Sequence, residues 1–157
     1  MQRTTDISDY IHPQVQYLEP IYQHYGAKVN FSGVISTVKC FEDNSLIRET
    51  LSGDGKGKVL VVDGGGSKSC AMLGDQMATI AINNGWEGVV IYGMIRDSDI
   101  IESMQIGIRA IGTHPLKSVK NGVGDIDLEV NFSGIRFTPG CYLYADMDGV
   151  IVVEEKI

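Results

Sequence analysis

The sequence predicts a mixed α/β sandwich in which part of the sheet is parallel. Short apolar runs such as KVLVV (58–62) and GVVIYG (88–93) indicate buried strands. The segment between them, GDQMATIAINN (74–84), has helical spacing, so strand, helix and strand form a parallel crossover unit. After residue 104 the chain changes to short strands separated by Gly, Pro and Asp, which indicates hairpins on the other side of the core.

The length and composition indicate one domain, residues 1–157. A chain of 157 residues with 43% hydrophobic residues buries a core without disulfides or metals. The sequence has no apolar run near the roughly 18 residues that a membrane span needs, and its N-terminus lacks the apolar segment of a signal peptide. We therefore expect a cytoplasmic protein that does not act on a membrane.

The first third of the chain predicts helices around one strand. In DISDYIHPQVQYLEPIYQHYG (6–26) apolar residues recur at helical spacing, but Pro13 and Pro20 interrupt them, so we expect two short helices ending at Gly26. The β-branched run VNFSGVISTVKC (29–40) predicts a strand. Asp43 or Asn44 is then expected to cap a helix that ends in a glycine-rich stretch.

The rest of the chain supplies the remaining elements. Gly85 is the expected C-cap of the helix in the crossover unit, and RDSDIIESM (96–104) predicts a further helix. Five short strands are expected after it, namely IRAIG (108–112), LEV (128–130), IRF (135–137), YLYA (142–145) and GVIVV (149–153).

Charge and cysteine content exclude several classes of function. The net charge is −7 and no Lys/Arg cluster appears in the sequence, so nucleic acid is not expected as a direct ligand. The acidic balance suits a basic protein partner or simply solubility. Cys40, Cys70 and Cys141 are widely spaced and odd in number, which indicates buried thiols and not a disulfide framework or a metal site.

Three charged residues stand at the two ends of the crossover unit. Asp75 begins the helix, and Arg96 and Asp97 follow the second strand. In an open α/β sheet, ligands collect outside the carboxyl ends of parallel strands. If the strands near residues 62 and 92 are neighbours, these three residues therefore meet at one rim of the sheet.

Such a rim has the chemistry for a small carboxylate. The backbone N–H groups of Asp75, Gln76 and Met77 at a helix start form an anion site. The Arg96 guanidinium matches a carboxylate, and Asp97 is a hard oxygen ligand for Mg²⁺ or Mn²⁺ held partly through water. A 2-oxo acid whose neighbouring oxygen is polarised by a metal fits this set.

Simpler roles remain open for each of these residues. Asp75 could be an N-cap alone, Arg96 and Asp97 a surface ion pair, and the glycines of DGGGS (63–67) a tight turn. That loop lacks the spacing of nucleotide-binding motifs, so nucleotide binding is not expected. His114 follows a strand and could reach the rim.

Beyond these patterns, the sequence resembles a known family. The segments that carry the resemblance are YLEPIYQHYG, VKCFEDNSLIRETL, KVLVVDGGGS, NGWEGVVIYG and DIDLEVNFSGIRFTPGCYLYADMDGVIVV. Together they resemble the family of the regulator of ribonuclease E activity A, which includes metal-dependent 4-hydroxy-4-methyl-2-oxoglutarate aldolases. The resemblance implies a three-layer β/β/α swivelling-type sandwich with a mixed sheet, and a ring-shaped homotrimer with sites between subunits.

The resemblance also implies roles for the rim residues. Aldolase and oxaloacetate decarboxylase members carry an Asp, twenty residues, then Arg-Asp, which Asp75, Arg96 and Asp97 match. By this resemblance Gly74, Asp75, Gln76, Met77 and Arg96 would bind the pyruvyl part of the substrate, and Asp97 would bind the divalent metal. The implied reaction is class II cleavage of a carbon–carbon bond through a pyruvate enolate. We expect Asp75, or a metal-bound water near it, to be the proton-transfer group.

The sequence favours an enzyme over a regulator, and decarboxylation over aldol cleavage. Longer aldolases of this family continue past the last strand, so we expect decarboxylation to be better supported than aldol cleavage. The alternative function is a non-catalytic regulator that binds and inhibits ribonuclease E. A pure regulator does not need three charged residues around a carboxylate-sized site, and this favours the enzyme.

Overall fold

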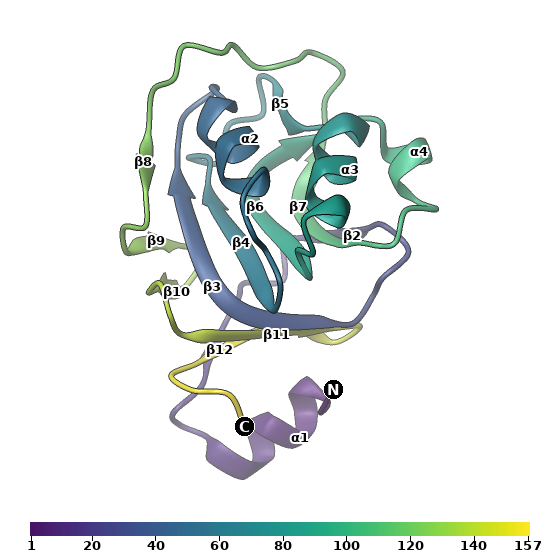
Figure 1. The fold of residues 1–157 in the computed structure, drawn as a ribbon. Helices are drawn as coiled ribbons and strands as arrows, with labels where there is room; N and C mark the ends of the chain where they lie inside the picture. The colour runs from purple at the N-terminus through teal and green to yellow at the C-terminus, as the bar shows by residue number, and fades with distance from the viewer.

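The computed structural model describes residues 1–157 and is built around a curled mixed sheet (Figure 1). Its strands follow the order β1-β12-β11-β3-β4-β6-β7-β2, with β5 beside β6 and β8 beside β3. The parallel part consists of β3 (Phe31–Lys39), β4 (Lys58–Asp63), β6 (Gly88–Ile95) and β7 (Gly107–Thr113). The predicted parallel unit is therefore present, and its two strands β4 and β6 are direct neighbours.

Three helices cover one face of this parallel sheet (Figure 1). They are α2 (Ser45–Leu51), α3 (Asp75–Asn83) and α4 (Ser98–Ile101), and each connects two parallel strands. Strand alternation divides the core between the two faces, because Leu60 and Val62 of β4 pack under the helices whereas Val59 and Val61 pack on the opposite side.

The opposite face is covered by antiparallel strands. They are the hairpin of β11 (Tyr142–Asp146) with β12 (Gly149–Val153), and the separate pair of β9 (Val130–Phe132) with β10 (Ile135–Phe137). Their buried side chains, Phe132, Phe137 and Leu143 among them, join the second core cluster. Helices, parallel sheet and antiparallel strands form the three layers of the predicted β/β/α sandwich, and the expected hairpins are confirmed.

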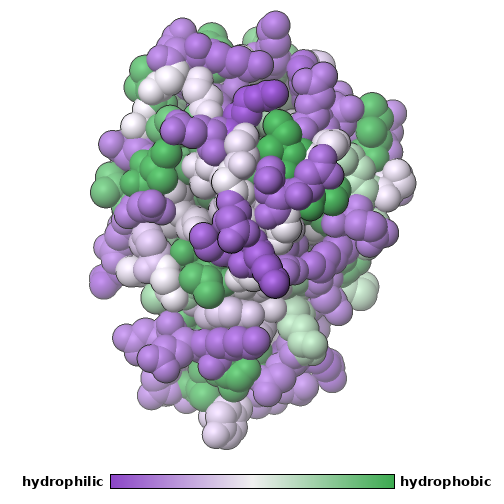
Figure 2. Space-filling model, in the orientation of Figure 1, coloured by the Kyte–Doolittle hydropathy of each residue, from purple (hydrophilic) through white to green (hydrophobic).

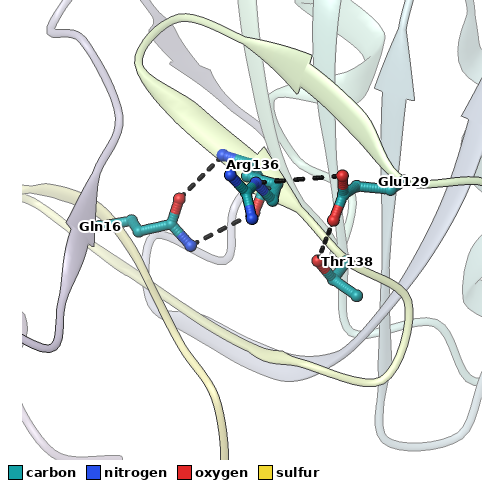
Figure 3. Close-up of polar contacts among 4 residues, drawn as sticks. All are labelled: Gln16, Glu129, Arg136 and Thr138. Carbon is teal, nitrogen blue, oxygen red and sulfur yellow. Dashed lines mark hydrogen bonds and ion pairs between the residues drawn. The ribbon is translucent and has the colours of Figure 1, made fainter.

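A polar clamp holds the β9–β10 pair against β1 (Gln16–Tyr17) (Figure 3). The Gln16 side chain accepts a hydrogen bond from Arg136 N at 2.8 Å and donates one to Arg136 O at 3.3 Å. The carboxylate of Glu129 accepts a hydrogen bond from Thr138 Oγ1 at 2.9 Å and lies 3.9 Å from Arg136 Nε.

The prediction of a second short helix before Gly26 is wrong. Helix α1 (Thr4–Ile11) forms, but the chain then runs through β1 and β2 (Gln23–Tyr25), which pairs with β7. Pro13 and Pro20 lack the N–H that a helix needs, and the six residues between them are too few for a stable helix. Two short strands, β5 (Ala71–Leu73) and β8 (Asp125–Ile126), had no sequence signal strong enough to predict them.

No helix is long and apolar enough to cross a bilayer. On the face seen in Figure 2, hydrophilic side chains predominate and the apolar ones form small separate groups. All three thiols are free, and Cys40 and Cys70 are buried as expected while Cys141 is partly exposed.

Candidate active site

The rim residues are brought together by a strand that the sequence did not predict. Strand β5 pairs in parallel with the end of β6, where Leu73 lies opposite Ile95. The Arg96 N–H donates to Leu73 O at 2.9 Å, so the two chain segments leave the sheet side by side. The Gly-rich loop after β4 enters β5 and not a helix, and it therefore lacks the helix start that a phosphate-binding loop uses.

Asp97 contacts the beginning of α3 directly. Its Oδ2 accepts a hydrogen bond from the Asp75 N–H at 3.1 Å, and its other carboxylate oxygen has no hydrogen-bond partner within the chain. Asp97 adopts the left-handed conformation, with φ 58° and ψ 35°. Non-glycine residues in this region are uncommon and concentrate at functional sites.

Gly74 makes this contact possible. A Cβ at this position would lie 2.6 Å from Asp97 Oδ2 and 3.6 Å from Arg96 Nε. Any side chain would therefore displace the carboxylate. The close approach explains why a glycine precedes the helix, where a side-chain cap would be more usual.

The expected anion site at the helix start needs one correction. The Asp75 N–H is not free, because it is bonded to Asp97. The first bond within α3 runs from Ala78 N to Gly74 O, so the amides of Gln76 and Met77 precede the intrahelical ladder and are the ones available to a ligand.

Arg96 is half-buried and forms no ion pair, neither with Asp97 nor with any other carboxylate. Its only side-chain hydrogen bond runs from one terminal nitrogen to Pro115 O, at 3.4 Å. The alternative of an Arg96–Asp97 surface ion pair is thus excluded in this structure. The guanidinium keeps most of its donors for a ligand.

All six residues predicted for the site line one pocket of about 110 Å³. They are Gly74, Asp75, Gln76, Met77, Arg96 and Asp97. His114 does not line it. A larger hollow of about 680 Å³ lies beside the β9–β10 turn, but its only charged lining residue, Arg136, is paired with Glu129.

Comparisons with known proteins agree with this architecture. The sequence matches the RraA-like family, described as Aldolase/RraA, over residues 4–152. The chain belongs to this family. A relative from Aromatoleum aromaticum, named "Putative 4-hydroxy-4-methyl-2-oxoglutarate aldolase", is 51% identical over 155 residues, which are 99% of this chain and 98% of the relative. Proteins of this length thus carry the aldolase name.

Two solved structures are very similar to this one. One, from Geobacillus kaustophilus HTA426, is 49% identical with a TM-score of 0.97, covering 99% of this chain and 97% of the other. It is described as an S-adenosylmethionine: 2-dimethylmenaquinone methyltransferase. The other, described as the RNA-processing inhibitor RraA from Thermus thermophilis, is 39% identical with a TM-score of 0.97, covering 100% and 95%.

Several lining residues were missed by the sequence analysis. The polar ones are Asn44, Arg48, Lys117 and Lys120. The rule that the carboxyl ends of neighbouring parallel strands meet at one edge applies to β3 and β7 as well as to β4 and β6. Applied to all four strands, it would have indicated the segments that follow β3 and β7, which carry these residues.

The pocket is positively charged in an acidic protein. Four cationic residues, Arg48, Arg96, Lys117 and Lys120, line it against the two carboxylates of Asp75 and Asp97, whereas the whole chain has a net charge of −7. A small polar anion fits these surroundings.

The donors present fit the kind of metal that the RraA-like family implies. No group of three His, Cys, Asp or Glu side chains is close enough to form a protein cage. A closed zinc site is therefore not formed by this chain. Mg²⁺ usually keeps several waters and takes one or two carboxylates, and Asp97, which has one oxygen without a partner, supplies one.

Proposed function

We propose that this RraA-like protein is a divalent-metal-dependent lyase that cleaves a carbon–carbon bond of a small 2-oxo acid through a pyruvate enolate. The observation that carries the proposal is the pocket in which an unpaired arginine, two carboxylates and a helix start face one another. The aldolase name of close relatives supports the reaction class.

Substrate binding is assigned to Arg96 and the first turn of α3. The Arg96 guanidinium donates to the carboxylate of the 2-oxo acid, because its donors are almost unused by the fold. The amides of Gln76 and Met77 donate to the same end of the substrate. Gly74 leaves room for the Asp97 carboxylate beside the helix start, since a Cβ there would lie 2.6 Å from Asp97 Oδ2.

The metal, Mg²⁺ or Mn²⁺, would be held by the free oxygen of Asp97 and would supply positive charge beside the oxygen that becomes negative as the bond breaks. The Asp75 amide keeps Asp97 oriented through the other oxygen. This arrangement holds the carboxylate in place before substrate binds.

Aldol cleavage and decarboxylation use the same pocket but move different protons. In aldol cleavage, the hydroxyl proton passes to a base and a carbonyl forms on the departing half. The electrons of the bond between the hydroxyl-bearing carbon and the pyruvyl fragment pass to that fragment as an enolate. Asp75 is the second carboxylate of the pocket, besides the metal-binding Asp97, and is assigned as the base for this proton. In oxaloacetate decarboxylation, CO₂ leaves and no hydroxyl proton is involved. Asp75 is therefore expected to matter more for aldol cleavage.

The test is an assay of purified protein with oxaloacetate and 4-hydroxy-4-methyl-2-oxoglutarate, with and without Mg²⁺ or Mn²⁺. Metal without protein is the control, because free divalent ions can act as Lewis acids on a 2-oxo acid. Metal-dependent pyruvate release that Arg96→Ala and Asp97→Ala abolish is the expected result. No release above the metal control, or equal release by these variants, would remove the proposal.

A second candidate is a regulator that binds ribonuclease E. It is supported by the similarity to the protein described as an RNA-processing inhibitor and by the acidic balance, which suits an arginine-rich segment. A salt-sensitive association with ribonuclease E in a pull-down supports it, and absence of binding at low salt contradicts it. The two functions are separable, because Arg96→Ala is expected to stop cleavage only.

The oligomeric state of the protein and its location in the cell are also proposals. We expect a homotrimer, which light scattering of the purified protein tests, and a cytoplasmic location, which cell fractionation tests. Direct binding to nucleic acid or to a membrane is not expected.

A further inference from the structure

Asparagine precedes glycine at two places in the chain, Asn84–Gly85 and Asn121–Gly122. Such a pair can rearrange without an enzyme, because the backbone nitrogen of the glycine can attack the side-chain carbonyl carbon of the asparagine and close a cyclic imide. Glycine favours the attack, since it has no Cβ to shield its nitrogen. The two pairs lie in different surroundings, so the fold decides which of them reacts.

Asn84 is held in an unreactive arrangement at the end of α3. Its side-chain amide donates hydrogen bonds to Leu51 O at 3.1 Å and to Ile80 O at 2.9 Å. The Gly85 N–H donates to Ile82 O at 3.1 Å. Both reacting groups are thus fixed by the fold, and the half-buried Asn84 reacts only after this end of α3 opens.

Asn121 lies in the connection between β7 and β8, which runs around the outside of the molecule (Figure 1). Its side chain is exposed, and only its backbone N–H forms a hydrogen bond within the chain. A Cβ at Gly122 would meet nothing within 4 Å, so the glycine has open space around it. Gly122 N donates one exposed hydrogen bond, to the Ser45 hydroxyl at 3.1 Å, and water can replace this partner.

One buried carboxylate anchors the backbone on both sides of this pair. Asp43 is 3% exposed, and its Oδ2 accepts hydrogen bonds from Asn121 N at 2.9 Å and from Val123 N at 3.2 Å. Its Oδ1 accepts from Ser45 N at 3.0 Å, at the start of α2. Asp43 therefore ties the exposed pair to α2, and any change in backbone length between Asn121 and Val123 acts on this anchor.

We propose that Asn121 is a site of spontaneous deamidation, at which isoaspartate forms and weakens the Asp43 anchor. Gly122 N forms a bond to Asn121 Cγ, and the amide nitrogen leaves as ammonia with the proton that Gly122 N gives up. One water molecule then opens the imide. Breaking the bond to the former backbone carbonyl carbon leaves isoaspartate, and breaking the bond to Cγ leaves aspartate.

Isoaspartate changes the anchor in two ways. The backbone then runs through the former side chain, which adds one methylene group between the two amides that bind Asp43 Oδ2. The released carboxylate also places a negative charge beside the Asp43 carboxylate, and the two repel each other. Both changes weaken the hydrogen bonds of Asn121 N and Val123 N. The modification does not depend on the proposed cleavage reaction.

The test follows both pairs in the whole purified protein, kept folded in mildly alkaline buffer for several weeks. Samples are digested at intervals, and the peptides that contain Asn84 and Asn121 are analysed by mass spectrometry with synthetic isoaspartyl peptides as standards. A sample digested at once gives the background. The same incubation in guanidinium chloride is the matched control, because unfolding exposes both pairs.

In the folded protein Asn121 is expected to deamidate at least about tenfold faster than Asn84, which must wait for local opening of the fold. In guanidinium chloride the two rates are expected to agree within about threefold, since the unfolded chain holds neither side chain in place. The Asn121→Gln variant must close a larger ring, and it is expected to lose most of the acidic species that anion exchange separates from the aged wild type.

An unmodified Asn121, equal rates for the two pairs in the folded protein, or acidic species unchanged by Asn121→Gln would overturn the site. Aspartate without isoaspartate would also overturn it, because direct hydrolysis would then replace the imide. The anchor is tested on the isoaspartyl form separated by anion exchange. Its midpoint of urea unfolding is expected to lie below that of the unmodified protein, and equal midpoints would contradict the weakened Asp43 anchor.

Discussion

Two arginines of this chain occupy opposite surroundings. Arg109 on β7 is 5% exposed, and its guanidinium donates to Val29 O at 3.0 Å and to Asp146 O at 2.8 Å. Arg96 is half-buried and has one hydrogen bond, to Pro115 O at 3.4 Å. An arginine whose donors are used by the backbone stabilises the fold, whereas one whose donors remain unused at a concave surface is available to a ligand.

The neighbours of Arg109 confirm its structural role. Its guanidinium lies 5.3 Å from the centre of the Phe31 ring and contacts His24 Nδ1. Burial lowers the pKa of Arg109 to about 10, partly offset by the nearby Asp146, so it stays charged at neutral pH. Burial and the adjacent guanidinium lower the pKa of His24, which therefore acts as a neutral acceptor.

The same contrast separates two aspartates. Asp146 is 8% exposed, and its carboxylate accepts hydrogen bonds from Thr4 N at 2.7 Å, Thr4 Oγ1 at 2.8 Å and Asp148 N at 2.9 Å. Asp97 accepts only the Asp75 N–H. The fold uses both oxygens of Asp146 and leaves one oxygen of Asp97 for another partner.

The largest effect is expected for Arg96→Ala. Loss of the guanidinium removes the carboxylate contact and the positive charge near the developing enolate, so kcat/KM falls about a hundredfold to a thousandfold. The free energy of unfolding changes by less than about 0.5 kcal/mol, because the fold hardly uses this side chain. Steady-state kinetics and urea unfolding of the same preparation measure kcat/KM and the free energy of unfolding. A large loss of stability would contradict the distinction between Arg96 and Arg109.

Arg109→Ala is expected to have the opposite effect, a loss of stability with little loss of activity. Removing this side chain leaves the carbonyls of Val29 and Asp146 without their donor and opens a cavity, so we expect a loss of about 3 kcal/mol in the free energy of unfolding. Activity per folded molecule at low temperature is expected to stay within a few-fold of the wild type. An unchanged free energy of unfolding would show that the buried guanidinium does not stabilise the fold.

A smaller effect is expected for Gly74→Ala, which tests the close approach of Asp97. The added methyl would lie 2.6 Å from Asp97 Oδ2, so the carboxylate must move, and kcat/KM is expected to fall about tenfold. Gly53→Ala is the matched control, since its methyl meets only Thr50 O at 3.4 Å. Equal activities for the two variants would contradict the assigned position of Asp97.

The smallest effect concerns stability at acidic pH. Burial acts to raise the pKa of Asp43, but hydrogen bonds from Ser45, Val123 and Asn121 outweigh it and lower the pKa to about 2. A lowered pKa contributes stability that is present above the unfolded value near 4 and is lost as the pH falls toward 2. Urea unfolding at pH 7, 4 and 3 is expected to show a smaller acid loss for Asp43→Asn than for the wild type.

Much of this architecture follows from sequence because its signals are local. The apolar runs of β4 and β6 and the periodicity of α3 predict the crossover unit, whose two strands are direct neighbours. Asp75 and Arg96 are brought together by β5, which pairs with the end of β6. The region from Pro13 to Gly26 was misread because helical spacing of apolar residues also occurs in short edge strands, where packing decides the outcome.

The site was less predictable because it depends on contacts between distant segments. Strand β5 has only three residues, and Ala71–Leu73 carries no pattern that distinguishes a strand from a loop. Lys117 and Lys120 reach the pocket through backbone bonds to β5 and to the start of α2. Such pairings have no local sequence signature.

The most direct test of the contrast is a paired measurement on Asp97→Asn and Asp146→Asn. For each variant, kcat/KM for oxaloacetate with Mg²⁺ and the midpoint of thermal unfolding are determined. The proposed roles predict that Asp97→Asn loses nearly all activity and keeps its midpoint, whereas Asp146→Asn lowers the midpoint by several degrees and keeps activity per folded molecule. An Asp97→Asn variant that retains wild-type activity would contradict the central claim.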